Sequence, residues 1–318
     1  MQVVFGAGQI GRRLAQRLPG PVRVVRRSAE PIDGVEVVSG DAGDPAFAVR
    51  AAAGARTLFH CLNPPYTARA WAESFPRFTA ALIEAAVTHD ARLVCLENLY
   101  PYGPSAEPLT EGSPHRPAGP KGQVRAAVAA ALAEAARTRG LRYTIGRAGD
   151  FFGPGAEQSA FSMDVVRGIR AGRPAYLLGD PQQPHAFSYV PDVVDALVAL
   201  GEAPADQVEG RTFHLPVLEV APAELHRRLC ARLGVAPKVR ALPRWALRPM
   251  SWFVPVLGEV RETLYQWEAP FRVDDSQFRS RFQPSPADPR LPEIGGRTEP
   301  RGWTSLDQAV EGAAASPA

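Results

Sequence analysis

Three glycines near the amino end have the spacing of a phosphate-binding turn. Gly6, Gly8 and Gly11 follow a short apolar run, residues 3–5, and precede a stretch with helical periodicity. Glycine at such positions permits a tight turn, a close approach of the backbone to a pyrophosphate, and close packing of a helix on a strand. The sequence therefore predicts a dinucleotide cradle, with a flavin site or a turn without nucleotide as the alternatives. The predicted cradle comprises Gly6, Gly8, Gln9, Ile10 and Gly11.

Two arginines and a serine, Arg26, Arg27 and Ser28, stand where the second apolar run, residues 22–25, ends. In sites for NAD, an acidic residue at this position binds the ribose hydroxyls. No carboxylate stands there in this chain, and a guanidinium pairs bidentately with a phosphate. The pattern therefore favours NADP(H), with NAD(H) still possible; two solvated arginines are the alternative.

Two further residues are expected to contact the cofactor. Asp41 closes the third apolar run and is a candidate partner of the adenine amino group, although an aspartate there also suits a helix cap. Leu62 ends the fourth run, and we expect it beside the cradle.

Polar side chains follow the fifth apolar run, residues 93–96. Open parallel sheets bind ligands in the crevice at this end of their strands. Glu97 is unusual there, because a buried carboxylate is costly unless it is paired; a general base with a raised pKa and a structural carboxylate bonded to loop N–H groups are equally good interpretations. Asn98 can orient a carbonyl oxygen but cannot transfer a proton, and Tyr100 is the preferred proton donor.

A parallel sheet is needed to bring these residues together. Short apolar runs alternate with longer helical patterns over the first two hundred residues, which is typical of a sheet with crossover helices. We therefore predict an α/β fold, a Rossmann-type doubly wound parallel sheet with a smaller C-terminal substrate lobe. The expected domains are residues 1–180, binding NAD(P), and residues 181–318, mostly substrate lobe with a late return to the sheet and an irregular tail from about residue 284. The expected strands are residues 3–5, 22–25, 35–38, 57–62, 93–96 and 141–145, and helices are expected after the cradle and near 67–87, 120–139, 162–171, 191–200 and 222–234.

The bulk composition excludes several kinds of partner. The 318 residues carry a net charge of +3, and their basic residues are scattered, which predicts neither a nucleic-acid partner nor a membrane partner. We expect no signal peptide, because a glycine loop and two arginines interrupt the first apolar run after a few residues, and the three cysteines lack metal-ligand spacing. We expect a cytoplasmic protein with no metal site and a small-molecule substrate, as a monomer or a homodimer.

The chain resembles the short-chain dehydrogenase/reductase superfamily in its extended or atypical branch, the NAD-dependent epimerase/dehydratase type. The resemblance rests on the glycine loop and on residues 99–103, 147–155 and 187–192, and it covers about residues 1–285. It implies the fold described above and an NAD(P)-dependent reaction at a carbonyl or alcohol carbon.

One departure from the family concerns the proton donor. Active members carry a tyrosine four residues before a lysine and a Ser or Thr after the fifth strand, whereas this chain has Pro117 before Lys121 and Asn98 at the hydroxyl position. The resemblance implies that Lys121 binds the nicotinamide ribose; a surface lysine with its ammonium in water is the alternative. The proton is then expected from Tyr100, Lys121 or water.

The family pattern extends to other loops. It implies that Tyr102 is structural and that Asp150 faces the substrate, with His185 and Tyr189 bordering the same pocket. A lid that packs on its own core is the alternative for the residues of the second half. His115 is a further candidate for proton transfer, because its unperturbed pKa is near neutral.

We therefore predict an NADP-dependent oxidoreductase that acts on a small carbonyl, alcohol or sugar-like substrate, with an epimerase or dehydratase cycle as one form of the reaction. A catalytically silent NADP(H)-binding sensor is the first alternative, and Pro117 is its best support. The polar groups gathered near Glu97 argue against a sensor. A non-redox isomerase or lyase on the same fold is the second alternative.

Overall fold

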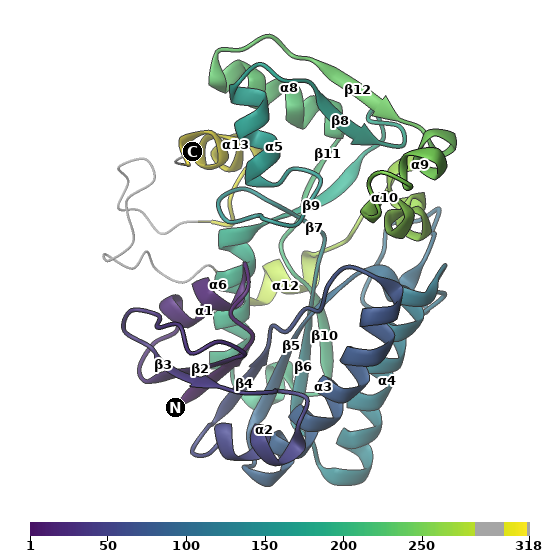
Figure 1. Ribbon diagram of the computed structural model, residues 1–318. Coiled ribbons are helices and arrows are strands. Elements are labelled where there is room, and N and C mark those ends of the chain that lie inside the picture. Colours follow the sequence, from purple (N-terminus) through teal and green to yellow (C-terminus); the bar gives the residue numbers. More distant parts are fainter. Residues whose placement is uncertain (284–301, 317–318) are drawn as a thin grey trace. The chain divides into compact units, whose positions relative to one another are not determined.

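The computed structural model describes residues 1–283 and 302–316 (Figure 1). The chain divides into two compact units. The first unit holds residues 1–104, 111–147 and 200–213, and the second holds residues 105–110, 148–199 and the described residues from 214 onward. The predicted domains, residues 1–180 and 181–318, were defined by function, the first for cofactor binding and the second for substrate binding. They are therefore not the same division as these two packing units, and they stay a prediction.

A seven-stranded sheet forms the first unit, in the order β10-β6-β5-β4-β1-β2-β3. Strand β1 pairs in parallel with β2 and with β4, β2 pairs in parallel with β3, and β4 with β5. The predicted Rossmann-type parallel sheet is confirmed. The strands are β1 Gln2–Phe5, β2 Val22–Arg26, β3 Glu36–Ser39, β4 Thr57–His60, β5 Arg92–Asn98, β6 Tyr143–Ala148 and β10 Arg211–His214.

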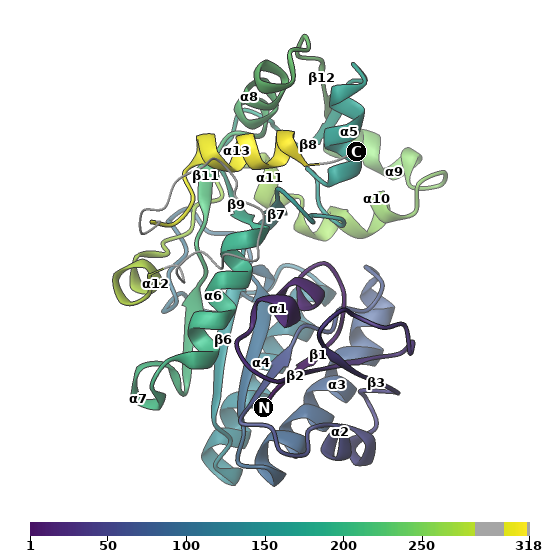
Figure 2. The same cartoon turned by 90° about the vertical axis from the view of Figure 1, so that its left-hand side faces the viewer.

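Helices cover both faces of this sheet, as Figures 1 and 2 show. Helices α2, α3 and α4 pack side by side on one face, and α1 lies on the other. Local signals set their ends: Asp44 and Thr67 cap α2 and α3 with side-chain oxygens, and Gly140 ends α4 in the left-handed conformation. The helices are α1 Gly11–Arg17, α2 Pro45–Ala51, α3 Ala68–Thr88, α4 Pro120–Arg139 and the short α7 Ala205–Val208, and a 3-10 turn, η1, spans Tyr100–Tyr102.

Buried Arg92 holds the last stretch of the first unit in place. It begins β5, and its guanidinium donates to the carbonyl oxygens of Leu200, Gly201 and Ala203 at 3.2, 3.2 and 2.8 Å. It also forms an ion pair with Glu209 at 3.4 Å. These bonds fix residues 200–213, so that β10 reaches the edge of the sheet beside β6.

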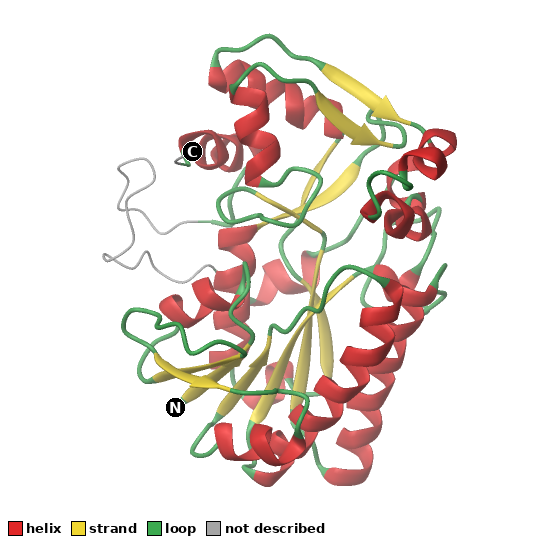
Figure 3. Ribbon diagram, viewed as in Figure 1, coloured by secondary structure: helices red, strands yellow, loops and turns green. Residues whose placement is uncertain are grey.

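The second unit has its own core around two small sheets. One sheet has the order β11-β9-β7, and in the other β12 pairs in parallel with β8. Figure 3 shows these short strands among helices. The strands are β7 Asp150–Phe152, β8 Ala175–Leu178, β9 His185–Tyr189, β11 Leu218–Val220 and β12 Val239–Leu242. The helical elements are α5 Met163–Arg170, α6 Val190–Glu202, α8 Pro222–Leu233, α9 Arg244–Met250, α10 Val256–Glu259, η2 Val260–Thr263, α11 Tyr265–Glu268, α12 Ser276–Arg281 and α13 Leu306–Ala315.

The tail corrects one expectation. We predicted an irregular tail from about residue 284, of which residues 284–301 lie outside the described residues. Within residues 306–315 the prediction is wrong, because this stretch forms α13. A capping box starts the helix: Ser305 accepts from the Gln308 backbone, and the Gln308 side chain accepts from Ser305. Within the described residues, no helix has the length and apolar character needed to span a bilayer.

Candidate functional site

The glycine loop after β1 has the geometry that its spacing predicts. Gly6 has φ +101°, and a Cβ there would lie 2.7 Å from the carbonyl oxygen of Cys61. A Cβ at Gly11 would lie 1.9 Å from the carbonyl oxygen of Gly6. A Cβ at Gly8, in contrast, would meet no described atom within 4 Å. Packing therefore requires glycine at the first and third positions, whereas Gly8 borders open space that a pyrophosphate can approach.

The other predicted contacts beside the cradle differ in exposure. The side chain of Ile10 is buried in the core, so this residue can offer a ligand its backbone only. The Gln9 carbonyl accepts a hydrogen bond from Arg13 at 2.9 Å. Leu62 lies next to the loop, since its backbone nitrogen would be 2.9 Å from a Cβ at Gly6.

A carboxylate that the sequence analysis overlooked stands at the end of β2. The Arg26 guanidinium donates to the Glu30 carboxylate at 2.9 Å and to the Glu30 carbonyl at 3.3 Å. One of the two predicted basic residues is therefore already engaged by a carboxylate of this chain. Arg27 and Ser28 are exposed beside it, and Arg27 is the better candidate for pairing with a phosphate.

Asp41 is held by two donors close to this position. Its carboxylate accepts from the Gly43 N–H at 2.9 Å and forms an ion pair with Arg77 at 2.8 Å. The Gly43 hydrogen bond and then the Arg77 guanidinium lower the pKa of Asp41. The helix cap is Asp44, whose side chain accepts from Ala46, so the capping alternative for Asp41 is wrong.

Lys121 lies inside a cluster of aromatic side chains. It is fully buried, so the alternative of a surface lysine is wrong. Its Nζ lies 4.6 Å from the centroid of the Tyr66 ring, and the Tyr66 and Tyr100 hydroxyls are 3.0 Å apart. Trp71 stacks on Tyr100 and meets Tyr66 edge-on, with centroid distances of 5.9 and 5.6 Å. The ammonium over a phenol ring is a cation–π contact.

Tyr66 was not among the predicted site residues, although the sequence carries a signal for it. Tyr66 follows β4 and Tyr100 follows β5, and these two strands pair in parallel. Residues that follow neighbouring parallel strands meet at the same edge of a sheet. The signal for Tyr66 is therefore a side chain with a hydroxyl group in the loop that follows a predicted strand.

The start of α4 brings Lys121 to the two tyrosines. A Cβ at Gly122 would lie 2.7 Å from the Tyr100 carbonyl oxygen and 2.8 Å from the Pro117 Cβ. Only glycine allows the helix to start so close to Tyr100. Pro117, at the position of the family tyrosine, thus packs beside the start of the helix and supplies no hydroxyl.

Glu97 lies in a buried charged cluster with two arginines that sequence reasoning missed. Its carboxylate pairs with the Arg147 Nε at 3.6 Å, and both side chains are almost wholly buried. Burial raises the pKa of Glu97, and Arg147 and then Arg125 oppose that rise. Within the described residues no hydrogen bond reaches either carboxylate oxygen, so the alternative of bonds to loop N–H groups is wrong. The Arg147 guanidinium also lies 4.6 Å from the Tyr102 ring, in agreement with a structural role for Tyr102.

Asn98 and His115 take different positions near this cluster. The Asn98 carbonyl oxygen accepts from the Tyr100 N–H at 3.1 Å and so shapes the turn that carries Tyr100. His115 is exposed and meets the Tyr102 ring edge-on at 5.6 Å. Partial burial and then Arg147 lower the pKa of His115.

In the second unit, His185 and Asp150 form a hydrogen-bonded pair. The His185 Nε2 lies 2.7 Å from the Asp150 carboxylate, and Nδ1 lies 2.9 Å from the Gln266 carbonyl. Both ring nitrogens of His185 therefore face oxygen atoms, and these two contacts fix the orientation of the ring. The ring stacks on Trp267 at 3.9 Å.

Tyr189 lies in the core of the second unit. Its ring is buried and would be 2.3 Å from a Cβ at Gly153, and its hydroxyl 2.2 Å from one at Gly312. Close packing of this kind favours the alternative of a lid packed on its own core for Tyr189.

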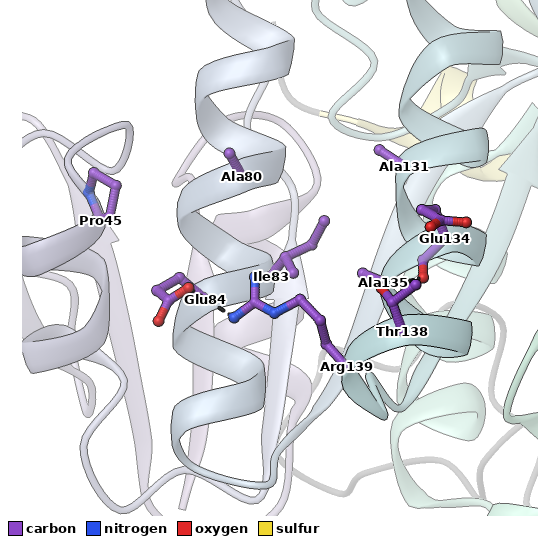
Figure 4. Close-up of a pocket in the computed structure, with 9 residues that line it drawn as sticks. All are labelled: Pro45, Ala80, Ile83, Glu84, Ala131, Glu134, Ala135, Thr138 and Arg139. Atoms are coloured by element: carbon purple, nitrogen blue, oxygen red, sulfur yellow. Dashed lines mark hydrogen bonds and ion pairs between the residues drawn. The ribbon is translucent and has the colours of Figure 1, made fainter.

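A shallow hollow between α3 and α4 is remote from this chemistry (Figure 4). The ion pair of Arg139 with Glu84, at 2.7 Å, crosses it. No predicted site residue lines it. Its lining residues are Pro45, Ala80, Ile83, Glu84, Ala131, Glu134, Ala135, Thr138 and Arg139.

Solved structures of sugar-nucleotide enzymes have the same fold. UDP-glucuronic acid 4-epimerase from Bacillus cereus, in complex with NAD, is 14% identical with a TM-score of 0.74, over 99% of this chain and 97% of that chain. UDP-glucose 4-epimerase from Thermotoga maritima is 18% identical with a TM-score of 0.73, over 99% and 97%. A dTDP-glucose 4,6-dehydratase double mutant from Streptomyces venezuelae, with NAD bound, is 19% identical with a TM-score of 0.72, over 98% and 95%.

Sequence comparison identifies the family. No curated protein matches this chain. The model of the NAD dependent epimerase/dehydratase family matches residues 3–215, about two thirds of the sequence. This is the family whose motifs the glycine loop and the later turns resemble. The chain belongs to the NAD dependent epimerase/dehydratase family.

Proposed function

We propose that this protein is an NADP-dependent oxidoreductase that acts on a nucleotide-linked sugar, in an epimerase or dehydratase type of reaction. The glycine cradle after β1, open at Gly8 and tightly packed at Gly6 and Gly11, is the observation that carries this proposal. The similar structures supply the substrate class, since they are enzymes of UDP- and dTDP-sugars. Two of these structures, the UDP-glucuronic acid 4-epimerase and the dTDP-glucose 4,6-dehydratase, hold NAD, so the preference for NADP rests on this chain's own residues.

The proposed cofactor contacts surround the cradle. The backbone of residues 6–11 holds the pyrophosphate, and Arg27 with Ser28 binds the 2′-phosphate, while Arg26 is engaged by Glu30. Asp41 and Leu62 contact the adenosine part. When bound, the nicotinamide supplies reversible two-electron oxidation and reduction at a carbon–oxygen bond.

Proton transfer is assigned to Tyr100 with Tyr66 as its partner. Two phenols 3.0 Å apart can pass a proton from one oxygen to the other. Lys121, beside the Tyr66 ring, stabilises negative charge on the pair and binds a ribose hydroxyl. Asn98 orients this turn through its bond to the Tyr100 N–H.

Other predicted residues have supporting or open roles. Glu97 balances the charge of buried Arg147, and its use as a general base stays a prediction. Asp150 and His185 are proposed to face the substrate as one hydrogen-bonded pair. The substrate role of Tyr189 also stays a prediction.

Cofactor titration tests the proposal. We expect NADPH to bind more tightly than NADH, and Arg27→Ala to reduce the preference more than Arg26→Ala. Gly8→Val should abolish binding by filling the space over the cradle without loss of fold, because a Cβ at this position would meet no atom of the described residues within 4 Å. Gly302→Val is the matched control, at another glycine with open surroundings. Equal affinities for the two cofactors would remove the 2′-phosphate assignment, and no binding of any nicotinamide nucleotide would remove the function.

A sensor that binds the cofactor without catalysis is the second candidate. Pro117, which cannot transfer a proton, is the observation that favours it. Consumption of NADPH with UDP- or dTDP-linked 4-keto sugars, or conversion of the corresponding sugars, would exclude a sensor. A protein that binds NADPH tightly and turns over none of them would support it.

A further inference from the structure

The large apolar side chains that are exposed in the described residues gather in one part of the second unit. Trp245, Trp252 and Phe253 are 79%, 85% and 86% exposed, and Val254 and Val256 are also exposed. These five residues, which we name the aromatic ridge, lie on α9, on α10 and on the turn between them. The green segment of Figure 1 shows this part of the chain. Exposed apolar groups that gather in this way indicate a binding surface.

The ridge belongs to a packed part of the second unit. Leu247 of α9 is fully buried in the core, so the helix has an inner apolar side and an outer one. The neighbouring strands β8 and β12 add exposed Tyr176 and Val239, and Tyr176 is paired in register with Arg240. Because successive residues of a strand point to opposite faces, Tyr176 and Arg240 share one face of this two-stranded sheet and Val239 lies on the other.

Positive charge accompanies the ridge. The residues from 238 to 259, which include all of α9 and α10, carry three arginines and a lysine against one acidic residue, Glu259 at the end of α10. Arg244 is paired with Glu268, and Lys238 donates to the Gly172 carbonyl. Arg240 and Arg248 are exposed, and no ion pair within the described residues engages them. Their charge is therefore available to an anionic surface.

The shape of the ridge favours a fluid partner over a rigid one. Trp252 and Phe253 are consecutive residues of a turn, and more than four fifths of each side chain is exposed. A protein partner would need deep, complementary pockets for both rings, whereas a lipid interface accommodates them without a fixed shape. Tryptophan is enriched at membrane interfaces, and arginines beside apolar side chains bind anionic headgroups.

We propose that the aromatic ridge, with Arg240 and Arg248, docks the second unit on the surface of a membrane that contains anionic lipids. The ring side chains enter the headgroup region and the guanidiniums pair with lipid phosphates, without any span of the bilayer. This inference does not depend on the proposed enzymatic function. It departs from our sequence-based expectation of no membrane partner, which rested on the scatter of basic residues along the chain.

Co-sedimentation of the full chain with vesicles tests the proposal. We expect binding to vesicles of phosphatidylcholine with about one third phosphatidylglycerol, and much weaker binding to pure phosphatidylcholine. Trp252→Ala combined with Phe253→Ala should weaken binding by about tenfold or more. Arg240→Ala with Arg248→Ala should remove the preference for anionic vesicles. Arg50→Ala with Arg116→Ala, an equal loss of exposed charge elsewhere, should leave binding unchanged.

Three results would overturn the proposal. These are the absence of sedimentation with either kind of vesicle, equal binding of the ridge variants and the parent protein, and a dimer in solution that Trp252→Ala with Phe253→Ala converts to a monomer. The last result would make the ridge an interface between two copies. Titration of each variant with NADPH monitors the cradle separately, so failure of docking and failure of the proposed function are distinguishable.

Discussion

At the scale of single residues, the phenol beside Lys121 comes from another part of the chain than the family pattern implies. Pro117 has no hydroxyl, but Tyr66, in the loop after β4, lies under the lysine ammonium. Its bond to Tyr100 joins two hydroxyls at one edge of the sheet. A buried ammonium and two phenol hydroxyls thus lie together, and the proposed proton relay uses these groups.

The first prediction at this scale concerns that pair. Tyr66→Phe and Tyr100→Phe should each lower turnover by about a hundredfold or more, with NADPH affinity unchanged, because each removes one hydroxyl of the proposed relay. The pH profile of turnover should shift in whichever variant keeps activity. Tyr176→Phe, which removes an exposed phenol, is the control. Full activity in both site variants would show that neither phenol carries the proton.

Some residue contacts were within reach of sequence reasoning and others were not. The separate roles of Gly6, Gly8 and Gly11 follow from one local turn, and their spacing predicts them. The pairs Glu97 with Arg147 and Arg26 with Glu30 depend on side-chain directions that a sequence pattern does not encode. The residue types that follow the strands therefore predict where the site lies, but not which side chains pair with one another there.

At the scale of elements, one buried arginine joins β5 to the chain that returns to the sheet. Arg92 satisfies three backbone carbonyls of residues 200–203. Without it the carbonyls of buried Leu200 and Gly201 and of partly buried Ala203 would lose this donor, which is costly.

We predict that Arg92→Met lowers the free energy of unfolding by about 3 kcal/mol. Denaturant unfolding measures the loss, and hydrogen exchange should become faster in residues 200–213. Arg56→Met is a matched control, since Arg56 pairs with Glu202 of the same stretch but is exposed; it should cost less than about 1 kcal/mol. Equal losses in the two variants would contradict the anchoring role of Arg92.

Most elements of the first unit were predictable because strand and helix alternate there with clear periodicity, but the seven-residue helix α2 was not among the expected helices. The short strands of the second unit were not, since β7 and β11 have three residues each and carry no alternation long enough to detect. For α13 the signal was present in Ser305 and Gln308, whose types and spacing are those of a capping box.

At the scale of the whole molecule, stability should depend on pH through a contact within the second unit. Asp192, on α6, accepts from the Thr304 hydroxyl at 2.7 Å and from its N–H at 3.1 Å. Burial nevertheless raises the pKa of Asp192 to about 6. The folded protein therefore holds this proton more tightly than the unfolded chain does. The resulting stabilisation is complete below about pH 4 and is lost as the pH rises through about 6.

We predict that Asp192→Asn gains stability relative to the parent protein as the pH rises from 4 to 7, by about 3 kcal/mol. Urea unfolding of both proteins at several pH values measures the difference between their free energies of unfolding. Groups that titrate in the same way in both proteins cancel in this difference. Exposed Asp206→Asn should show no such trend. A constant difference between Asp192→Asn and the parent would show that the carboxyl titrates equally in the folded and unfolded states.

The cytoplasmic location and the oligomeric state stay predictions.

The alternation of the chain between its two units limits how the protein can be divided. The first unit is assembled from three separate stretches, so no single cut releases it intact. A fragment that ends at residue 147 lacks β10 and leaves Arg92 without its carbonyl partners. Exchange of the second unit for that of a relative, in evolution or by recombination in the laboratory, must therefore preserve several junctions at once.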